Sequence, residues 1–583
     1  MRDGYPRPQF ERAEYRSLNG EWNYSLPDGE CGKIVVPYVC QSKASGIGKP
    51  LPGGEITCER TFSVPESWSG NRIVLHFGAV DYRADVYVNG KHAVSHGGGQ
   101  SPFSADITDL LHASGEQSLR VEISDDPYEQ RIPRGKQYWK DAGDWIFYTP
   151  STGIWQEVWM EPVPVNALQL LRMTADTDRG CVRIEAEVGR KCKLPCKVTF
   201  FVTREGEPIA DAAVTMRTRR TSVELELFHG DVKAGTHFDN GLCWSPENPV
   251  LFGLTAELDA GAGVCDRVES YFGMRKLSCV NGKLYLNNHP YEQRLVLDQG
   301  YWPDGLLTPP GPDAFRTDIE KAKQLGFNGC RKHEKAEDPR FLYWADKLGF
   351  LVWGATSSFY SYDETAADCH LAEWKALLQR DYNHPSIVCW DMLNESWGVP
   401  AIRGDKRQQA YADALYALAH AMDGTRPVIS NDGWEMTHTD ICALHSYQHG
   451  GNKDHAKRAR FAETLKDLGT LSASALLEHH EAFAEGYAYA GQPVFLSEFG
   501  GTSFDFGGGW GYQAIHTEEE FLEDYDKLIG IIADSGLFCG YCYTQLTDVE
   551  QEKNGLMDAD RNFKVDPEKF RALMEKHPCI VRK

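Results

Sequence analysis

The sequence lacks the features that mark membrane and exported proteins. No run of eighteen or more apolar residues occurs among its 583 residues, which excludes a membrane-spanning helix. Its N-terminus does not place an apolar stretch after a basic one, as a signal peptide does. We therefore expect no membrane partner and a cytoplasmic protein, or a periplasmic or secreted one if a leader was removed.

Positive charge is also scarce. The chain has 61 Lys and Arg residues against 84 Asp and Glu residues, which gives a net charge of −23. No stripe of basic residues and no known nucleic-acid-binding motif offsets this acidic field, which repels phosphate backbones. The sequence therefore predicts no nucleic-acid partner.

The cysteines form neither a disulfide framework nor a zinc site. The 16 cysteines are scattered along a long chain rather than clustered in a short one. Cys539 and Cys542 are two residues apart, but no second pair lies at zinc spacing, and both fall in an apolar run typical of a strand. We expect buried thiols.

What the sequence does contain is enough apolar material for several cores. Hydrophobic residues make up 42% and aromatic residues 11%, so the chain is folded, and its length indicates more than one domain. Short alternating apolar runs broken by turns predict an antiparallel β-sandwich up to about residue 164. A second set of such runs, from about 168 to 274, has the size of an immunoglobulin-like sandwich. We place the first domain at residues 1–165 and the second at 166–275.

From residue 276 to 583 strand patterns alternate with helical ones, which indicates a parallel sheet. Phe315, Ile319 and Ala322 share one face of a predicted helix that ends before Gly326, and Pro339 begins the next. Eight such units in about 300 residues predict a (β/α)8 barrel. We expect its strands at 292–297, 328–331, 350–353, 387–393, 428–430, 441–444, 494–496 and 537–544.

Two glutamates directly follow strands of this barrel. Glu395 comes after the fourth predicted strand and Glu498 after the seventh. Barrel enzymes draw their reactive groups from the carboxyl ends of different strands, so the two side chains can face each other across one pocket. Cleavage of a glycosidic bond needs such a pair, one to protonate the leaving oxygen and one to attack the anomeric carbon or activate water. A cap or ion-pair role is the alternative for either glutamate alone.

The segments around both glutamates resemble glycoside hydrolase family 2. Residues 381–398 resemble its acid/base segment and 496–500 its nucleophile segment, and 18–22, 87–90, 151–156 and 271–275 extend the resemblance along the chain. The resemblance implies a jelly-roll sugar-binding domain, an immunoglobulin-like domain and a catalytic barrel. It also implies retention of anomeric configuration, with Glu395 as acid/base and Glu498 as nucleophile, and no cofactor or metal in the reaction.

Further site residues follow from the resemblance. Asn394 matches the residue that hydrogen-bonds the sugar 2-hydroxyl, and Tyr447 matches the partner of the nucleophile. The other candidates end strands, where they can bind hydroxyls, or offer aromatic faces to the sugar ring. These are Arg331, His333 and His445, then Asp298, and the aromatic residues Trp302, Trp397, Trp434 and Tyr543.

Two departures bear on the substrate. Relatives that cleave β-glucuronides carry Asn-x-Lys-Gly near the end of the barrel, whereas here Lys553 precedes Asn554. After the second strand the chain also departs from β-galactosidases, and we read Lys332 and Lys335 as a solvated loop, with contact to an acidic sugar as the alternative. We expect a carbohydrate substrate, first a β-galactoside, then a β-glucuronide or β-galacturonide, with a β-mannoside or α-L-arabinoside as further alternatives.

Two other classes of function remain as alternatives. A carbohydrate-binding protein that has lost catalysis is disfavoured, because both glutamates are present. A metal-dependent hydrolase is disfavoured, because the strand-end His and Asp residues form no obvious ligand set. Relatives of the resembled family are often dimers or tetramers, which makes a homo-oligomer the expectation.

Overall fold

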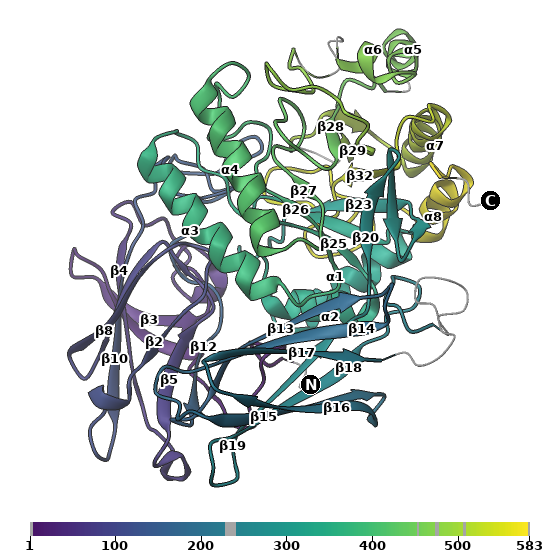
Figure 1. The fold of residues 1–583 in the computed structure, drawn as a ribbon. Helices are drawn as coiled ribbons and strands as arrows, with labels where there is room; N and C mark the ends of the chain where they lie inside the picture. The colour runs from purple at the N-terminus through teal and green to yellow at the C-terminus, as the bar shows by residue number, and fades with distance from the viewer. Residues whose placement is uncertain are drawn as a thin grey trace.

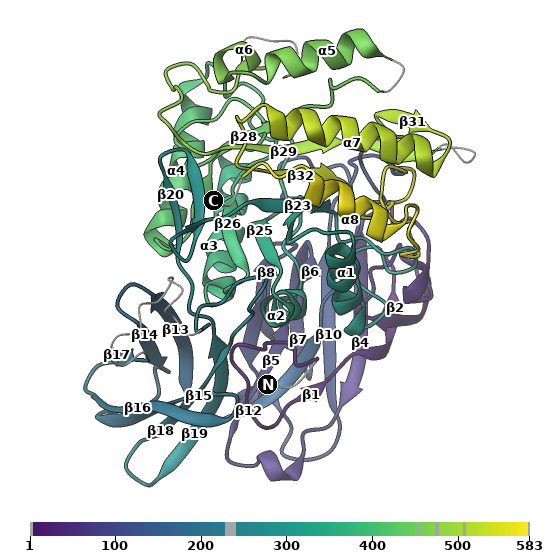
Figure 2. The same cartoon turned by 90° about the vertical axis from the view of Figure 1, so that its right-hand side faces the viewer.

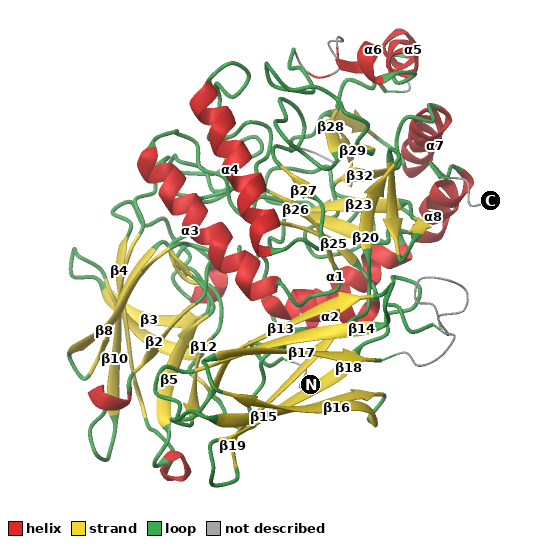
Figure 3. Ribbon diagram, viewed as in Figure 1, coloured by secondary structure: helices red, strands yellow, loops and turns green. Residues whose placement is uncertain are grey.

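A computed structural model describes residues 4–227, 241–451, 454–472, 477, 479–504 and 509–580. It contains two β-sandwiches and a barrel, which lies above both in the view of Figure 1. Figure 3 shows that the α-helices gather in the barrel, whereas the sandwiches consist of strands, loops and single helical turns. None of the described helices is long and apolar enough to cross a membrane.

The first sandwich is built from antiparallel sheets, as the alternating pattern predicts. Apolar residues from both sheets, such as Trp22, Leu75 and Val121, form its core. The six-stranded sheet has the order β3-β2-β4-β10-β7-β8 and the four-stranded sheet β1-β12-β5-β9, with β6 and β11 as a separate pair. The strands are β1 (Arg16–Ser17), β2 (Gly20–Ser25), β3 (Cys31–Val36), β4 (Glu55–Phe62), β5 (Arg72–Phe77), β6 (Val80–Asp81), β7 (Arg83–Val88), β8 (Lys91–Gly97), β9 (Phe103–Asp106), β10 (Gln117–Ser124), β11 (Gly153–Ile154) and β12 (Val158–Val163).

The second sandwich packs a three-stranded sheet on a four-stranded one. The orders are β13-β14-β17 and β16-β15-β18-β19, and their inward residues, among them Ile184, Phe200 and Leu254, form a separate core. This confirms the immunoglobulin-like prediction. The strands are β13 (Leu168–Asp176), β14 (Cys181–Val188), β15 (Cys196–Arg204), β16 (Glu207–Met216), β17 (Arg220–Glu226), β18 (Phe252–Asp259) and β19 (Val264–Phe272).

The barrel follows a small sheet of β20 (Leu277–Val280), β21 (Lys283–Leu286) and β22 (His289–Pro290). Its eight parallel strands have the order β27-β26-β25-β24-β23-β32-β29-β28, and all eight fall where the sequence predicts them. The last is shorter than predicted. The strands are β23 (Gln293–Asp298), β24 (Gly329–Lys332), β25 (Leu351–Ala355), β26 (Ile387–Asp391), β27 (Val428–Ile429), β28 (Cys442–His445), β29 (Val494–Gly500) and β32 (Gly540–Thr544).

The helices surround these strands, and β30 (Thr502–Phe504) pairs with β31 (Gln513–Ile515) beside them. Figure 2 shows α7 and α8 next to each other on the outside of the barrel, at the front of that view. Gly326 and Gly349, which follow α1 and α2, have the positive φ of left-handed caps. The helices are α1 (Asp313–Gln324), α2 (Pro339–Leu348), α3 (Glu364–Asp381), α4 (Lys406–Met422), α5 (His455–Thr464), α6 (Leu468–Ser472), α7 (Glu518–Asp534) and α8 (Pro567–Lys576).

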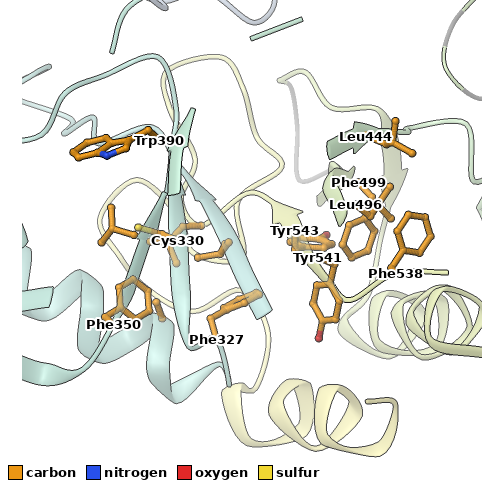
Figure 4. Close-up of a cluster of buried hydrophobic side chains, with 14 of the residues drawn as sticks. Phe327, Cys330, Phe350, Trp390, Leu444, Leu496, Phe499, Phe538, Tyr541 and Tyr543 are labelled. Atoms are coloured by element: carbon orange, nitrogen blue, oxygen red, sulfur yellow. The ribbon is translucent and has the colours of Figure 1, made fainter. Parts of the chain in front are cut away.

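Side chains alternate between the inside and the outside of the barrel. Leu295 and Leu297 of β23 belong to the core within the barrel, whereas Val296 between them packs in the layer beneath the helices. Figure 4 shows this outer layer, with Cys330 of β24 and Tyr541 of β32 among its members. The alternation decides which residues after each strand can reach a pocket at the barrel's mouth.

Candidate active site

Glu395 and Glu498 line one pocket at the carboxyl end of the barrel. One atom each of Glu395, His445 and Glu498 lies within 4.8 Å of the others. Carboxylates about 5 Å apart suit attack by one of them on the anomeric carbon, whereas a wider gap leaves room for water. These three side chains are also a group that could hold a metal ion, but Arg331 already places a positive charge on Glu498.

A β-bulge turns Glu498 into the pocket. Leu496 and Phe499 both pack in the outer layer, although strict alternation would put residues three apart on opposite faces. The register of β29 shifts against both β28 and β32 within this stretch. The extra residue re-aims the Glu498 side chain inward, a use of bulges that is common beside active sites.

A tight turn after β26 places Glu395. Glu395 and Ser396 both have positive φ, 50° and 58°. The Glu395 amide donates to the Asp432 carbonyl (2.8 Å), and the Ser396 amide donates to Asn431 Oδ1 (3.0 Å). Backbone strain of this kind persists only where neighbouring groups hold it, and it concentrates at functional sites.

Arg331, at the centre of the carboxyl end, ties four side chains together. Its Nε lies 2.7 Å from both Asp391 Oδ2 and Asp432 Oδ2, and its two terminal nitrogens donate to Glu498 Oε1 and Asn394 Oδ1, each at 2.7 Å. Only 1% of the Arg331 side chain is exposed, so its hydrogen bonds to Asp391, Glu498 and Asn394 are charge-assisted bonds in a low dielectric, and Asp432 adds an ion pair. The guanidinium therefore orients both the Glu498 carboxylate and the Asn394 amide.

His445 connects the two glutamates. Its Nδ1 lies 2.8 Å from Glu395 Oε1, and its Nε2 lies 3.3 Å from Asp432 Oδ1 and 3.6 Å from Glu498 Oε1. Burial opposes the charged imidazole, but the charges of Glu498 and Asp432 outweigh it and raise the pKa of His445 to about 10. The protonated ring therefore donates to Glu395.

Burial also acts on Glu395, where it favours the neutral acid. The hydrogen bond from His445 and the charges of Lys136 and Arg331 overcome that effect and hold the pKa of Glu395 below its ordinary value. The second Glu395 oxygen accepts from Trp397 Nε1 at 3.3 Å. Both shifts favour a protonated imidazole paired with an ionised Glu395 carboxylate.

The remaining predicted residues of the pocket bind Glu498 or line the wall. Tyr447 donates to Glu498 Oε2 (2.6 Å) and stacks on Tyr512 with ring centroids 3.5 Å apart. His333 Nδ1 lies 3.0 Å from Gln299 Oε1, and its Nε2 lies 3.4 Å from Glu498 Oε1. Burial lowers the pKa of His333 well below its ordinary value, which keeps that ring neutral.

The structure does not bring Asp298 or Tyr543 to the pocket. Both share the outward face of their strands, next to Val296 and Tyr541 respectively. The Asp298 carboxylate accepts from Lys332 Nζ (2.8 Å) and from the Gly300 amide (2.9 Å). Tyr543 packs against aromatic rings such as Phe499, with centroids 5.5 Å apart. The inward positions belong instead to their neighbours Gln299 and Thr544, which do line the pocket.

Trp434 and Trp302 also lie outside the wall of the pocket. Trp434 stacks on His480 (4.2 Å between centroids) and makes an edge contact with the His445 ring. Trp302 lies under the guanidinium of Arg561, 3.7 Å from its ring centroid. Of the four aromatic candidates, only Trp397 lines the pocket.

Lys332 and Lys335 are buried rather than solvated. Lys332 Nζ lies 2.7 Å from Glu337, and Lys335 Nζ donates to the carbonyls of Gly300 (2.6 Å) and Leu307 (2.9 Å). Neither lines the pocket, so the solvated-loop interpretation is wrong for both, and so is the alternative contact with an acidic sugar.

Several pocket residues were not predicted from the sequence. Gln299 and Thr544 carry a usable signal, since they continue the inward alternation of their strands. Lys136 and Phe147 carry none, because they reach the pocket from the loop 125–152 of the first sandwich. The others are Ile146, Leu297, Glu334, Tyr360, Tyr512 and Glu552.

Family models describe the same three parts of the chain. The sugar binding domain of glycosyl hydrolases family 2 matches residues 48–160, the model named Glycosyl hydrolases family 2 matches 171–275, and its TIM barrel domain matches 311–576. The chain belongs to glycosyl hydrolase family 2. This confirms the resemblance, and with it the jelly-roll, immunoglobulin-like and barrel architecture.

Relatives in the family carry two kinds of name. A β-galactosidase of Thermoanaerobacter pseudethanolicus is 24% identical over 378 residues, which cover 63% of this chain and 47% of that protein. A β-glucuronidase of Paenibacillus borealis is 24% identical over 553 residues, which cover 85% and 84%. The chain spans about half the length of the first two curated relatives that it matches.

Solved structures of two proteins share the whole fold. A β-D-glucuronidase of Dictyoglomus thermophilum superimposes with a TM-score of 0.78 at 18% identity, covering 99% of this chain and 100% of that one. A β-glucuronidase of Bifidobacterium dentium gives 0.77 at 21% identity, covering 97% of both chains. At such identities the likeness speaks for the fold alone.

Proposed function

We propose that this protein is a retaining exo-β-glycosidase that removes a terminal sugar by a double displacement. The observation that carries the proposal is the pair Glu395 and Glu498, with one oxygen of each within 4.8 Å of the other in a pocket where Arg331 and Tyr447 orient the second. Membership of a family of glycosyl hydrolases supports it.

In the first step Glu498 attacks the anomeric carbon. Hydrogen bonds from Arg331 and Tyr447 hold one carboxylate oxygen each and so fix the direction of attack. The bond between the anomeric carbon and the leaving oxygen breaks, and the leaving oxygen takes a proton from the Glu395–His445 pair. Asn394, held by Arg331, is placed to bind the neighbouring hydroxyl.

In the second step Glu395 acts as the base. Esterification removes the negative charge of Glu498, which is one of the charges that keep His445 protonated. Glu395 draws a proton from water, the oxygen of that water attacks the anomeric carbon, and the bond to Glu498 breaks. The free carboxylate and the shared proton are both restored.

The comparisons leave two candidate sugars. β-Galactosidases are among the relatives, which agrees with the β-galactoside that we expect first from the sequence. The relative from Paenibacillus borealis and the two solved structures described above, which this chain covers over most of their length, are β-glucuronidases, which favours a β-glucuronide over a β-galactoside.

The experiment is trapping of the nucleophile. Incubation with 2-deoxy-2-fluoro-β-glycosyl fluorides of galactose and of glucuronic acid should add one sugar to the intact protein, with the label on the peptide that contains Glu498. Glu498→Gln should take no label and lose at least about 10⁴-fold in kcat on any substrate that the wild type cleaves. Asp298→Asn serves as a control, because that carboxylate faces away from the pocket. A label on another carboxylate, or activity that survives in Glu498→Gln, contradicts the proposal.

A further inference from the structure

We propose that Lys136, in a loop of the first sandwich, binds a carboxylate carried by the terminal sugar and so selects a uronic acid over the neutral sugar of the same configuration. The proposal rests on the glycosidase function proposed above and adds a specificity-determining residue from outside the barrel.

The loop holds the Lys136 backbone rigidly against the barrel. Gly135 has a φ of +56°, and a Cβ there would lie 2.2 Å from the Glu334 carbonyl oxygen, so the loop approaches the end of β24 as closely as only glycine allows. The Gly135 amide donates to the Ser358 carbonyl (3.0 Å) and the Tyr148 amide to the Lys136 carbonyl (2.7 Å). The Lys136 side chain therefore extends to the pocket from a backbone that is held in place.

The ammonium of Lys136 has no direct counter-charge. Lys136 is 6% exposed and lines the same pocket as Glu395 and Glu498. Among the residues that the structure describes, no hydrogen bond or ion pair is made by its Nζ, which lies 5.5 Å from the ring centroid of Phe147 and 5.6 Å from that of Tyr148. By contrast, the other two cations at the site, Arg331 and His445, contact carboxylates at 2.7 and 2.8 Å.

The nearby carboxylates are occupied by other donors. Glu552 accepts from the Tyr148 hydroxyl (2.6 Å) and from Asn554 Nδ2 (3.1 Å), and Glu334 accepts from the amide and hydroxyl of Ser358 (2.6 and 2.8 Å). Burial raises the pKa of both carboxyl groups, to about 7 for Glu334, and the charge of Lys136 opposes that rise without a direct contact. Lys136 is thus left as the cation that can meet an incoming anion.

A buried ammonium with no partner is costly, and an anion supplied by the substrate removes that cost. The anion must be carried by the sugar itself, because the pocket that Lys136 lines is the one in which the anomeric carbon has to meet Glu498. A carboxylate in place of the hydroxymethyl group is the smallest such change to a hexose. Lys332 and Lys335, which the sequence offered only as an alternative contact for an acidic sugar, are closed off by other partners in the barrel. The sandwich supplies Lys136 in their place.

The test uses two pairs of p-nitrophenyl substrates that differ only in this group: β-glucuronide with β-glucoside, and β-galacturonide with β-galactoside. We expect the wild type to prefer the acidic member of one pair. Lys136→Met should lower kcat/KM for that acidic substrate about 100-fold or more and for its neutral partner less than about 5-fold, since truncating one partner of a buried charge pair has costs of that size. Lys136→Arg should keep part of the preference.

The matched control is Lys140→Met, an exposed lysine of the same loop whose Nζ lies over the Tyr138 ring. It should change neither value. If Lys136→Met lowers both members of a pair equally, Lys136 acts through the charge on Glu395 and the proposal is overturned; a wild type that prefers the neutral sugar overturns it as well. Either result leaves the glycosidase function standing. That function fails, and the role of Lys136 with it, if the wild type cleaves all four substrates no faster than Glu498→Gln.

Discussion

Arg331 and Lys332 are neighbours in β24, and each belongs to a different cluster of buried charged residues. The inward cluster faces the pocket, and the outward cluster lies on the helix side of β23 and β24. The inward cluster consists of Arg331, Asp391, Asn394, Glu395, Asp432, His445 and Glu498, and the outward cluster of Asp298, Lys332, Lys335 and Glu337.

The difference between the clusters is whether their carboxylates reach open space. In the outward cluster, Glu337 is bound by Lys332 and Lys335, and Asp298 by Lys332 and a backbone amide. In the inward cluster, Glu395 and Glu498 are held but also line the pocket. Burial and ion pairing alone therefore do not identify a catalytic group, since the carboxylates of the outward cluster have both.

The largest effect on activity should come from a change in the inward cluster. Glu395→Gln removes the acid while keeping its shape, and we expect kcat to fall by about 10² to 10⁴ for a poor leaving group such as an alkyl alcohol. For a leaving group of low pKa, such as dinitrophenol, the first step needs little proton donation and should fall far less. The measurement is kcat/KM against leaving-group pKa. An equal loss across that series would contradict the acid role, and thermal stability should stay within a few degrees.

A change in the outward cluster should lower the stability of the protein rather than its activity. Glu337→Gln leaves Lys332 and Lys335 without the carboxylate that they share, and removing one partner of a buried ion pair destabilises by about 3 to 5 kcal/mol. The expected result is a lower melting temperature, measured by calorimetry, with unchanged KM and leaving-group dependence for the molecules that remain folded. Glu320→Gln, on the exposed i,i+4 pair with Arg316, is the matched control and should change stability by less than about 1 kcal/mol. A changed leaving-group dependence in Glu337→Gln would erase the distinction between the clusters.

The smallest expected effect is a difference between the clusters in how their contribution to stability depends on pH. The folded pKa of His445, about 10, lies above its unfolded value of about 6.5, so its stabilisation is complete below about pH 6.5 and is lost as pH rises toward 10. The charges of Lys332 and Lys335 overcome burial and lower the pKa of Glu337 to about 2, so its stabilisation is present above about pH 4.5 and is lost as pH falls toward 2.

Melting temperatures of the wild type, His445→Gln and Glu337→Gln from pH 5 to 9.5 would measure this. The gap between wild type and His445→Gln should narrow by a few degrees above pH 7, whereas the gap to Glu337→Gln should stay constant over that range. Parallel curves for both variants would contradict the charged state of His445.

The architecture could be predicted from the sequence because each domain repeats one pattern of apolar residues along its length. Alternating apolar runs predicted the two sandwiches, and strands alternating with helices predicted the barrel. In the barrel, α1 ends before Gly326 and α2 begins at Pro339, as expected. The final strand is shorter than its apolar run because Leu537, Phe538 and Cys539 precede the first paired residue, Gly540. Composition shows that a residue is apolar but not where pairing begins.

The site was predictable only where a residue ends a strand and faces inward. Alternation along β23 and β32 would have excluded Asp298 and Tyr543 in favour of Gln299 and Thr544. The same rule would have misplaced Glu498, whose strand carries a bulge. Lys136 could not be predicted, because its place depends on how a distant loop docks on the barrel.

The glycine that lets this loop approach the barrel has a consequence for how substrate preference can change. Because Gly135 brings the sandwich into van der Waals contact with the end of β24, one wall of the pocket is inherited with the N-terminal domain rather than with the barrel. A recombinant that exchanges residues 125–152 between two members of the family should carry a new preference for the sugar into a pocket whose carboxylates, Glu395 and Glu498, are unaltered. A barrel separated from its sandwich would keep those carboxylates but lose that wall.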